Sequence, residues 1–216
     1  PKLVSPTTRE KVQNAISELG YVPEAAAGAL SSGKSQIVAA NISTLSGSIF
    51  LPTINKLSSI LSQHGIQLIL SNSEYSEEIE FQQLSALIAQ RPLGLVLSNA
   101  FNSPKRRSML SRMGCKVIEI WDLPTKPIDY AVGFSNFDAG YSMTQFLFKH
   151  CLYKKIAFLG TKQGFDRRSE MRFQGYKNFQ IKYKNQIRAV DLNASGKGSI
   201  YDGTIGLNQI LEKWPD

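Results

Sequence analysis

Short apolar runs alternate with amphipathic helical segments from Gln36 to the end of the chain, and this alternation most constrains the fold. Seven runs have the length and composition of strands, and the segments between them space their apolar residues as helices do. The strands are expected at residues 36–42, 66–71, 94–97, 116–120, 131–134, 156–160 and 187–191. The helices are expected at 50–63, 76–90, 103–113, 138–149, 169–184 and 200–212. This order predicts an α/β fold, with parallel sheets covered by helices on both faces.

The stretch 128–160 gives a first position for a binding site. It consists of an apolar run, a polar turn, an amphipathic helix and a second apolar run, which is typical of a parallel α/β unit. Ligands of such sheets bind beyond the carboxyl ends of the strands. The turn Ser135-Asn136-Phe137-Asp138 follows such an end, and it offers an amide, a ring and a carboxylate to a polyhydroxylated ligand. The basic linker 149–155 leads to a strand that is expected to open a second subdomain.

Composition indicates a soluble globular chain of one large domain or two small ones, because 42% of its 216 residues are hydrophobic and 19% are charged. No run of 18 apolar residues occurs and the first residues do not form a signal peptide, so we expect a cytoplasmic protein, neither membrane-bound nor exported. The net charge of +8 is compatible with a polyanionic partner. The basic residues, however, occur in short pairs that are typical of solvated surface, namely Arg106-Arg107, Lys154-Lys155 and Arg167-Arg168.

The cysteines and histidines do not predict a metal or catalytic site. Cys115 and Cys151 lie next to apolar runs without metal-like spacing, so we expect buried, reduced thiols. His64 and His150 are expected at the surface of helices, without a metal or nucleophile partner. No enzyme activity, metal or cofactor is therefore expected.

The first twenty residues predict a short helix. Ser5 can cap it with Pro6 at the first helical position, and Thr7-x-x-Glu10 is an alternative capping box. One apolar stripe follows and stops at Gly20. A helix this short needs a packing partner, and residues 24–30 are expected to form a weaker second helix.

Residues Gly28 to Ser35 match the phosphate-binding pattern G-x-x-x-x-G-K-S. A phosphate loop requires a buried strand before it and a helix after it, so that the loop amides and the helix N-terminus point at the phosphates. Here a helical stretch precedes the motif and the strand at 36–42 follows it. A nucleotide-binding enzyme is therefore an unfavoured alternative.

Three groups of motifs resemble the LacI/GalR family of bacterial transcription regulators. They are Val4-Ser5-Pro6-Thr7-Thr8-Arg9-Glu10-Lys11-Val12 with Glu18-Leu19-Gly20-Tyr21-Val22-Pro23 and Ala26 to Leu30; then Ala131-Val132-Gly133-Phe134-Ser135-Asn136-Phe137-Asp138-Ala139; then Lys155-Ile156-Ala157-Phe158-Leu159-Gly160 with Arg172-Phe173-Gln174-Gly175-Tyr176. The resemblance covers essentially the whole chain and rests on the order and spacing of the motifs. Within the family, the segment 119–144 is most similar to the gluconate-operon repressors.

The resemblance implies a fold like that of periplasmic binding proteins, with doubly wound parallel sheets in two lobes. Residues 1–22 would be the last helix of a helix-turn-helix headpiece, and 23–35 the hinge helix and linker. Residues 36–152 would form the N-terminal lobe, and 153–216 an incomplete C-terminal lobe. We therefore expect a fragment that is shortened at both ends.

The resemblance also implies a ligand-responsive repressor that forms a homodimer and binds operator DNA. In the family, a hinge-helix leucine enters the minor groove. Leu30 matches that position, with Ala26 and Ala29 in the same hinge helix, although Leu30 can also be read as a lone apolar residue in a linker. The alternative within the fold is an exported sugar-binding protein.

A small sugar or sugar acid such as gluconate is the effector that the resemblance implies. Arg172 matches the family's ligand arginine, Asp138 a carboxylate that accepts sugar hydroxyls, and Phe50 an aromatic that covers a sugar face. The turn adds Asn136. Phe50 can equally be core, and Asp138 can be the N-cap of its helix. Ser135 departs from the family's usual aspartate.

Overall fold

The computed structural model describes residues 4–21, 35–45, 49–98, 103–161, 166–184, 188–193 and 200–214. The chain divides into two compact units, Pro1–Gln36 and Ile37–Asp216. The expected hinge residues Ala26, Ala29 and Leu30 lie outside the described residues, as does most of the motif at 28–35.

The first unit contains the helix that the sequence predicts, α1 (Pro6–Leu19). Ser5 rather than Thr7 is its N-cap, because the Thr8 backbone N–H donates to Ser5 Oγ at 3.2 Å. The helix ends at Gly20, whose φ of 59° is accessible to glycine without strain. None of its residues is buried, so its apolar stripe has no cover within this unit.

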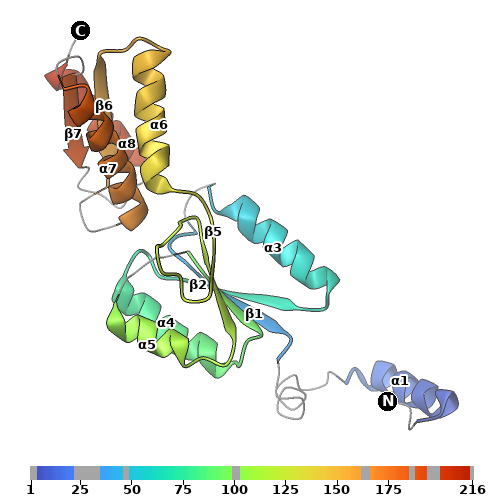
Figure 1. The fold of residues 1–216 in the computed structure, drawn as a ribbon. Coiled ribbons are helices and arrows are strands. Elements are labelled where there is room, and N and C mark those ends of the chain that lie inside the picture. Colours follow the sequence, from blue (N-terminus) through green and yellow to red (C-terminus); the bar gives the residue numbers. More distant parts are fainter. Residues whose placement is uncertain are drawn as a thin grey trace. The chain divides into compact units, whose positions relative to one another are not determined.

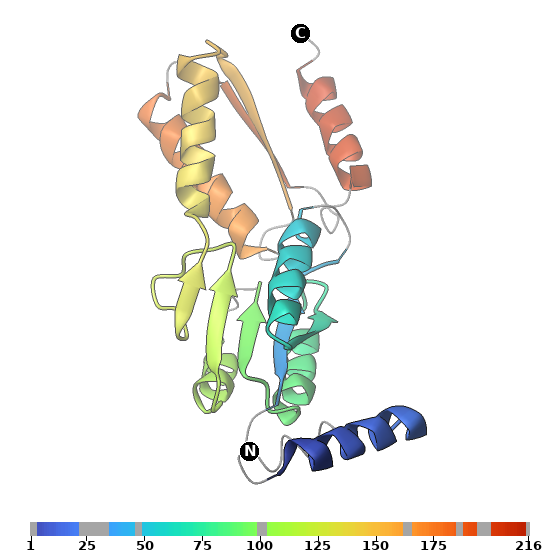
Figure 2. The ribbon, with the colours of Figure 1, turned by 90° about the vertical axis from the view of Figure 1, so that its right-hand side faces the viewer.

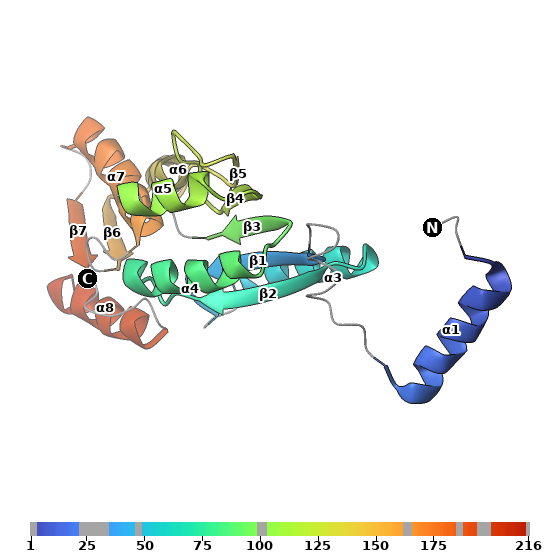
Figure 3. The same ribbon diagram turned by 90° about the horizontal axis from the view of Figure 1, so that it is seen from below.

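The second unit begins with a five-stranded parallel sheet of order β2-β1-β3-β4-β5 (Figures 1 and 3). Its strands are β1 (Ile37–Ile42), β2 (Gln67–Asn72), β3 (Gly94–Leu97), β4 (Lys116–Ile120) and β5 (Tyr130–Val132). Its helices are α3 (Leu51–Gln63), α4 (Glu77–Ala89) and α5 (Pro104–Ser111). Since β1 follows the motif at 28–35 directly, that motif lacks the helix a phosphate loop requires.

The side chains of this sheet alternate between two cores. Ala39, Leu95 and Val117 point to the face covered by α4 and α5, and Ala40 and Val96 point to the face covered by α3 (Figure 1). This alternation is the two-residue period of a strand buried on both sides, and it confirms the predicted doubly wound sheet.

A second sheet pairs β6 (Lys155–Gly160) with β7 (Arg188–Asn193) in parallel. Helices α6 (Asn136–Lys149) and α7 (Arg167–Lys182) cover one face, and α8 (Ile200–Lys213) covers the other (Figure 2). The core contains Ile156, Tyr176 and Phe179, with Tyr141 and Phe148 of α6 packed against them. Helix α6 therefore packs with the second sheet, whereas the boundary expected after residue 152 would separate it from these partners.

Several local expectations need correction. Helix α6 begins at Asn136 rather than Asp138, and β5 ends at Val132 rather than Phe134. Cys151 is exposed and Cys115 is only partly buried, so the expectation of two buried thiols is wrong. His64 and His150 are exposed, as predicted.

Two of the three basic pairs contain a buried arginine, contrary to the surface position expected for them. Arg106 is 3% exposed and Arg168 is 5% exposed. Arg106 Nε bonds to Glu80 Oε1 at 2.6 Å, and its Nη1 lies 3.7 Å from Glu119 Oε1. Burial is tolerated because the guanidinium lies within reach of both carboxylates and offsets part of their charge.

Candidate functional site

The carboxyl ends of β1 and β3 meet at the point where the strand order reverses. Ser43 follows β1 and Ser98 follows β3; their hydroxyls are 2.7 Å apart, and the Ser43 N–H donates to Ser98 Oγ at 2.6 Å. Both residues are buried. Open α/β sheets bind ligands at such a switch point, so this pair marks where a site is expected.

Arg168, in the first turn of α7, reaches this strand end. Its Nη2 donates to Ser43 Oγ at 3.1 Å, and its Nε donates to Asp166 Oδ1 at 3.1 Å. Asp166 is also the N-cap of α7, since its carboxylate accepts from the Arg168 backbone N–H. In the part of the chain that the structure describes, the buried Arg168 Nη1 has no hydrogen-bond partner.

Aromatic rings surround the Arg168 guanidinium. Its Cζ lies 5.2 Å from the centroid of the Phe50 ring and 5.9 Å from that of Tyr75. Phe50 in turn packs against Trp121, with ring centroids 4.4 Å apart. Packed, tilted rings with a cation over one of them are suited to hold the apolar face of a sugar beside a polar group.

Two of these aromatic residues have an unusual backbone. Tyr75 has φ 61° and Trp121 has φ 63°, a region that non-glycine residues rarely adopt. Such conformations persist where the surroundings enforce them, and they occur often at functional sites. Burial raises the pKa of Tyr75, although the charge of Arg168 opposes this shift, so Tyr75 remains a neutral phenol near pH 7.

Asn136 connects the first sheet to α7. Its Nδ2 donates to the Trp121 carbonyl and to Asp122 Oδ1, both at 3.1 Å. Its Oδ1 accepts from Arg172 Nη1 at 2.5 Å. Because Asn136 is 1% exposed and bonded on both sides of its amide, it fixes the orientation of Arg172.

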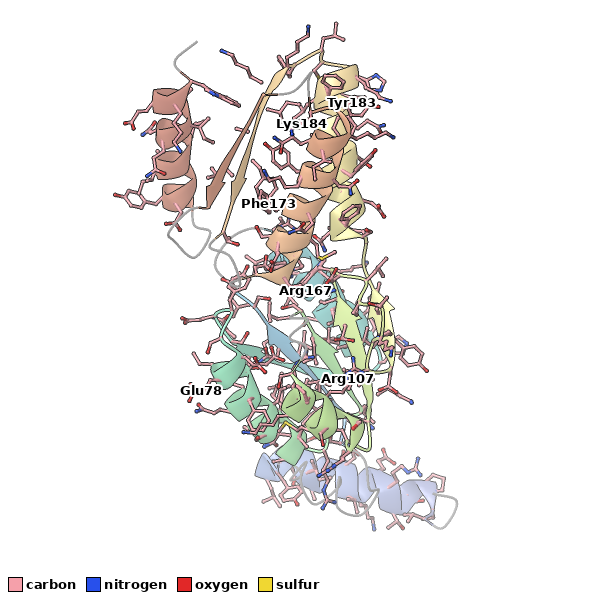
Figure 4. All side chains as sticks on the ribbon, turned by 60° about the vertical axis from the view of Figure 1, so that its left-hand side comes forward. Glu78, Arg107, Arg167, Phe173, Tyr183 and Lys184 are labelled. Atoms are coloured by element: carbon pink, nitrogen blue, oxygen red, sulfur yellow. The ribbon has the colours of Figure 1, made fainter. Side chains whose placement is uncertain are left out.

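Charged pairs extend this connection. Arg167 Nη1 donates to Asp122 Oδ2 at 2.7 Å, and Arg167 lies at the end of α7 that faces the first sheet, whereas Tyr183 and Lys184 lie at its other end (Figure 4). Arg172 Nη2 lies 4.0 Å from Asp166 Oδ2. Burial lowers the pKa of Arg172, partly offset by the charge of Asp166, and the guanidinium remains a cation near pH 7.

We call these residues the inter-sheet cluster. Its members are Ser43, Phe50, Tyr75, Trp121 and Asp122 on the first sheet, and Asn136, Asp166, Arg167, Arg168 and Arg172 at the start of α6 and α7.

Close helix packing holds the second part of the cluster in place. A Cβ on Gly140 of α6 would overlap the Arg172 carbonyl, and a Cβ on Gly175 of α7 would overlap the Phe137 carbonyl. Only glycine allows the two backbones to approach this closely. The side chains of Asn136 and Arg172 consequently stay within hydrogen-bonding distance.

Arg106, the buried arginine of α5, helps to hold the cluster residues of the first sheet in place. Glu119, close to Arg106, accepts from the Ile128 N–H with its Oε2 at 2.9 Å. This bond ties β4 to the far end of the loop that carries Trp121 and Asp122. At the start of the next connection, a Cβ on Gly133 would lie 2.6 Å from the Asp122 backbone N and O, so the two segments press together.

The structure brings together three of the four effector residues that the sequence predicts. Phe50, Asn136 and Arg172 belong to the inter-sheet cluster. Asp138 is exposed in the first turn of α6, and its N–H donates to Ser135 Oγ at 3.0 Å. Ser135 is therefore the N-cap, and the N-cap role considered for Asp138 is wrong.

Sequence reasoning missed most of the cluster. The residues that it did not single out are Ser43, Tyr75, Trp121, Asp122, Asp166, Arg167 and Arg168. A usable signal existed, because each of them follows a predicted strand closely or lies at the start of α7.

The described residues show neither a metal centre nor a membrane span. Within them, no three or more His, Cys, Asp or Glu side chains are grouped to hold a metal ion. No helix in the described ranges is long and apolar enough to cross a bilayer.

Comparison with known proteins gives a consistent result. The family model for periplasmic binding proteins and the sugar binding domain of the LacI family matches residues 37–216. The HTH-type transcriptional regulator GntR of Escherichia coli K12 is 30% identical over 181 residues, which are 84% of this chain and 54% of GntR. IdnR of the same strain is 26% identical over 216 residues, 100% of this chain and 64% of IdnR.

The solved structures agree with this result. The crystal structure of a LacI family transcriptional regulator from Silicibacter pomeroyi has a TM-score of 0.88 and 34% identity, over 99% of this chain and 63% of that one. The chain spans 54–64% of the length of these three relatives.

Proposed function

Since the chain belongs to the LacI family of transcriptional regulators and is related to the gluconate-operon repressors, we propose that it is part of a sugar-responsive repressor. Its effector is a small sugar or sugar acid such as gluconate, bound at the inter-sheet cluster. The repressor is a cytoplasmic homodimer that binds operator DNA. No catalysis is involved.

One observation carries the proposal: aromatic rings beyond the strands of the first sheet lie against the buried guanidinium of Arg168, in the first turn of α7. Phe50 and Trp121 lie with ring centroids 4.4 Å apart, and Arg168 reaches across to Ser43. Sugar sites combine an apolar face with a few placed polar groups. The cluster offers both, at the switch point of a parallel sheet.

Each predicted residue has a role in this proposal. Phe50 covers one face of the effector. Arg172, oriented by Asn136, binds effector oxygens with its planar guanidinium. Asp138 lies outside the cluster in the structure, and its proposed role is to accept effector hydroxyls at the exposed start of α6.

Effector binding would act through the contacts between the two sheets. A ligand that contacts both Phe50 of the first sheet and Arg172 of α7 binds more tightly when the two are close together. It therefore shifts the equilibrium towards the conformation in which they are close. The shift would alter the hinge helix of residues 23–35 in the dimer. Leu30, flanked by Ala26 and Ala29, would then leave the minor groove and release the operator.

The complete gene product tests this proposal. Duplexes that it selects from a random DNA pool serve as the operator probe, and gluconate affinity is measured by calorimetry. We expect gluconate to release the probe in gel shifts. Phe50→Ala should weaken gluconate binding and leave DNA binding intact, and Leu30→Ala should do the reverse. If the protein selects no DNA sequence, it is not a repressor. If its affinity for DNA is the same in the presence and absence of every sugar acid and sugar tested, it is not controlled at this site.

A further inference from the structure

We infer that Arg168 holds the acidic group of the effector, so that the inter-sheet cluster selects an acidic polyol over its neutral counterpart. The inference rests on the proposed function, and it assigns the acidic group to Arg168 instead of Arg172. The ligand class is an open-chain sugar acid with one carboxylate.

The hydrogen bonds of Arg168 leave one side of its guanidinium available. Nε is bonded to Asp166 and Nη2 to Ser43. Nη1 is buried and, among the described residues, has no partner. A buried donor without an acceptor is costly, and a ligand oxygen at Nη1 removes that cost.

The charges of the cluster favour an anionic acceptor. Three arginines face two carboxylates, and both carboxylates are engaged: Asp122 by Arg167 and Asn136, and Asp166 by Arg168 and the N-terminus of α7. The cluster therefore carries one net positive charge, and Arg168, which is 5% exposed, shares its carboxylate partner Asp166 with Arg172. An opposite charge is attracted most strongly where water is excluded.

Arg172 is less suited to this role. Its Nη1 already donates to Asn136 at 2.5 Å, and 39% of its side chain is exposed. Solvent screens a charge in that position. Arg172 is therefore expected to bind hydroxyl oxygens, which both acidic and neutral polyols carry.

Three probes of nearly equal shape isolate the charge: D-gluconate, its neutral amide D-gluconamide, and D-glucitol, in which the carboxylate is replaced by a hydroxymethyl group. Affinities are measured by calorimetry on the complete gene product. The parent protein should bind gluconate about tenfold or more tightly than gluconamide, because a charge-assisted hydrogen bond is stronger than a neutral one. D-glucose 6-phosphate serves as a further probe, since a phosphate is the other anionic group a sugar can present.

Variants assign the preference to one residue. Arg168→Gln should bring the gluconate-to-gluconamide ratio to about one. Arg172→Gln should weaken gluconate, gluconamide and glucitol together and leave the ratio unchanged. Arg107→Gln, which removes an equal charge from the exposed surface of α5, should change nothing. If Arg168→Gln does not fold, Arg168→Lys keeps the cation but loses the planar fork, and the ratio should still fall severalfold.

The outcomes separate the inference from the proposed function. If the parent binds none of the probes, the proposed effector class fails. If it binds gluconate and gluconamide equally, or if the ratio collapses in Arg172→Gln and persists in both Arg168 variants, only the role of Arg168 is overturned. If the parent prefers the sugar phosphate to gluconate, the anionic group of the effector is a phosphate instead of a carboxylate. Arg168 then remains the residue that binds the anion only if Arg168→Gln abolishes this preference.

Discussion

Arg168 donates a hydrogen bond of 3.1 Å to Ser43, which lies 125 residues earlier in the chain. The bond links the first turn of α7 to the carboxyl end of β1, and Ser43 passes the link to Ser98 at the end of β3. A small set of polar side chains thus connects the two sheets at the point where the proposed effector binds. The contribution to stability of the contacts that hold these side chains in place can be measured directly.

Loss of the buried cation on α5 should strongly destabilise the second unit. Arg106→Met would leave Glu80 and Glu119 as buried carboxylates without their partner, and we expect a loss of about 3–5 kcal/mol in the free energy of unfolding. Urea denaturation measures it. Arg107→Met, at the exposed neighbour, should cost about 1 kcal/mol or less. Equal losses for the two variants would show that the buried ion pairs do not matter.

The two glycines at the crossing of α6 and α7 should not tolerate a methyl group. Gly175→Ala forces the helices apart, so we expect a loss of about 1–3 kcal/mol in thermal or urea unfolding. Gly203→Ala on α8 is the matched control, because a Cβ there meets no atom of the described residues beyond its own helix backbone within 4 Å. It should stabilise the protein by about 0.5–1 kcal/mol through helix propensity. Stabilisation by both changes would contradict the close packing described here.

Leu152 should be replaceable by glycine with a gain in stability. It has φ 59° and is 75% exposed, so its backbone is strained and its side chain contributes little packing. A left-handed conformation costs a non-glycine residue about 1–2 kcal/mol, of which part is offset by the greater chain entropy of unfolded glycine. Leu152→Gly should therefore raise the melting temperature, whereas Leu152→Ala, which keeps the strain, should not. A lower melting temperature for Leu152→Gly would mean that the side chain packs on something.

The two cysteines should differ in their pH-dependent alkylation. Burial, helped by the negative charge of Asp129, raises the pKa of Cys115. A raised pKa leaves less reactive thiolate at any pH below it, so Cys115 should require a higher pH than an ordinary thiol. The reaction with iodoacetamide is run at pH 7–8, roughly one unit below an ordinary thiol pKa, and followed by mass spectrometry. We expect Cys151, which is exposed, to be modified before Cys115. Cys151→Ser should abolish the fast reaction, and rapid labelling of this variant at neutral pH would contradict the shift.

The sequence was sufficient for the order of the elements because strand and helix periods are local properties. Gly94–Leu97 and Lys116–Ile120 form strands at the predicted residues. The sheet to which an element belongs is not local, and the predicted strand, helix, strand unit at 128–160 in fact passes from the first sheet to the second.

The same limit explains the missed site residues. Nothing in the local sequence distinguishes the buried Arg168 from the neighbouring Arg167, because the burial of Arg168 depends on Ser43 and Phe50, far away in the chain. Arg106 is likewise buried by partners on α4 and β4. The family resemblance predicted Phe50 and Arg172, and the polar turn after a predicted strand predicted Asn136. Tertiary pairing decided the rest.

The contact between Gly133 and Asp122 gives the connection from β5 to α6 a mechanical property. The two backbones lie in close contact there, and the glycine-to-carbonyl contacts hold α6 against α7, so a rotation at this point would carry both helices together. With 14 residues, α6 is roughly 21 Å long, and a tilt of about 5° moves its far end by about 2 Å. A small rotation in the loop around Asp122 would therefore displace the opposite end of the helix pair by a larger distance.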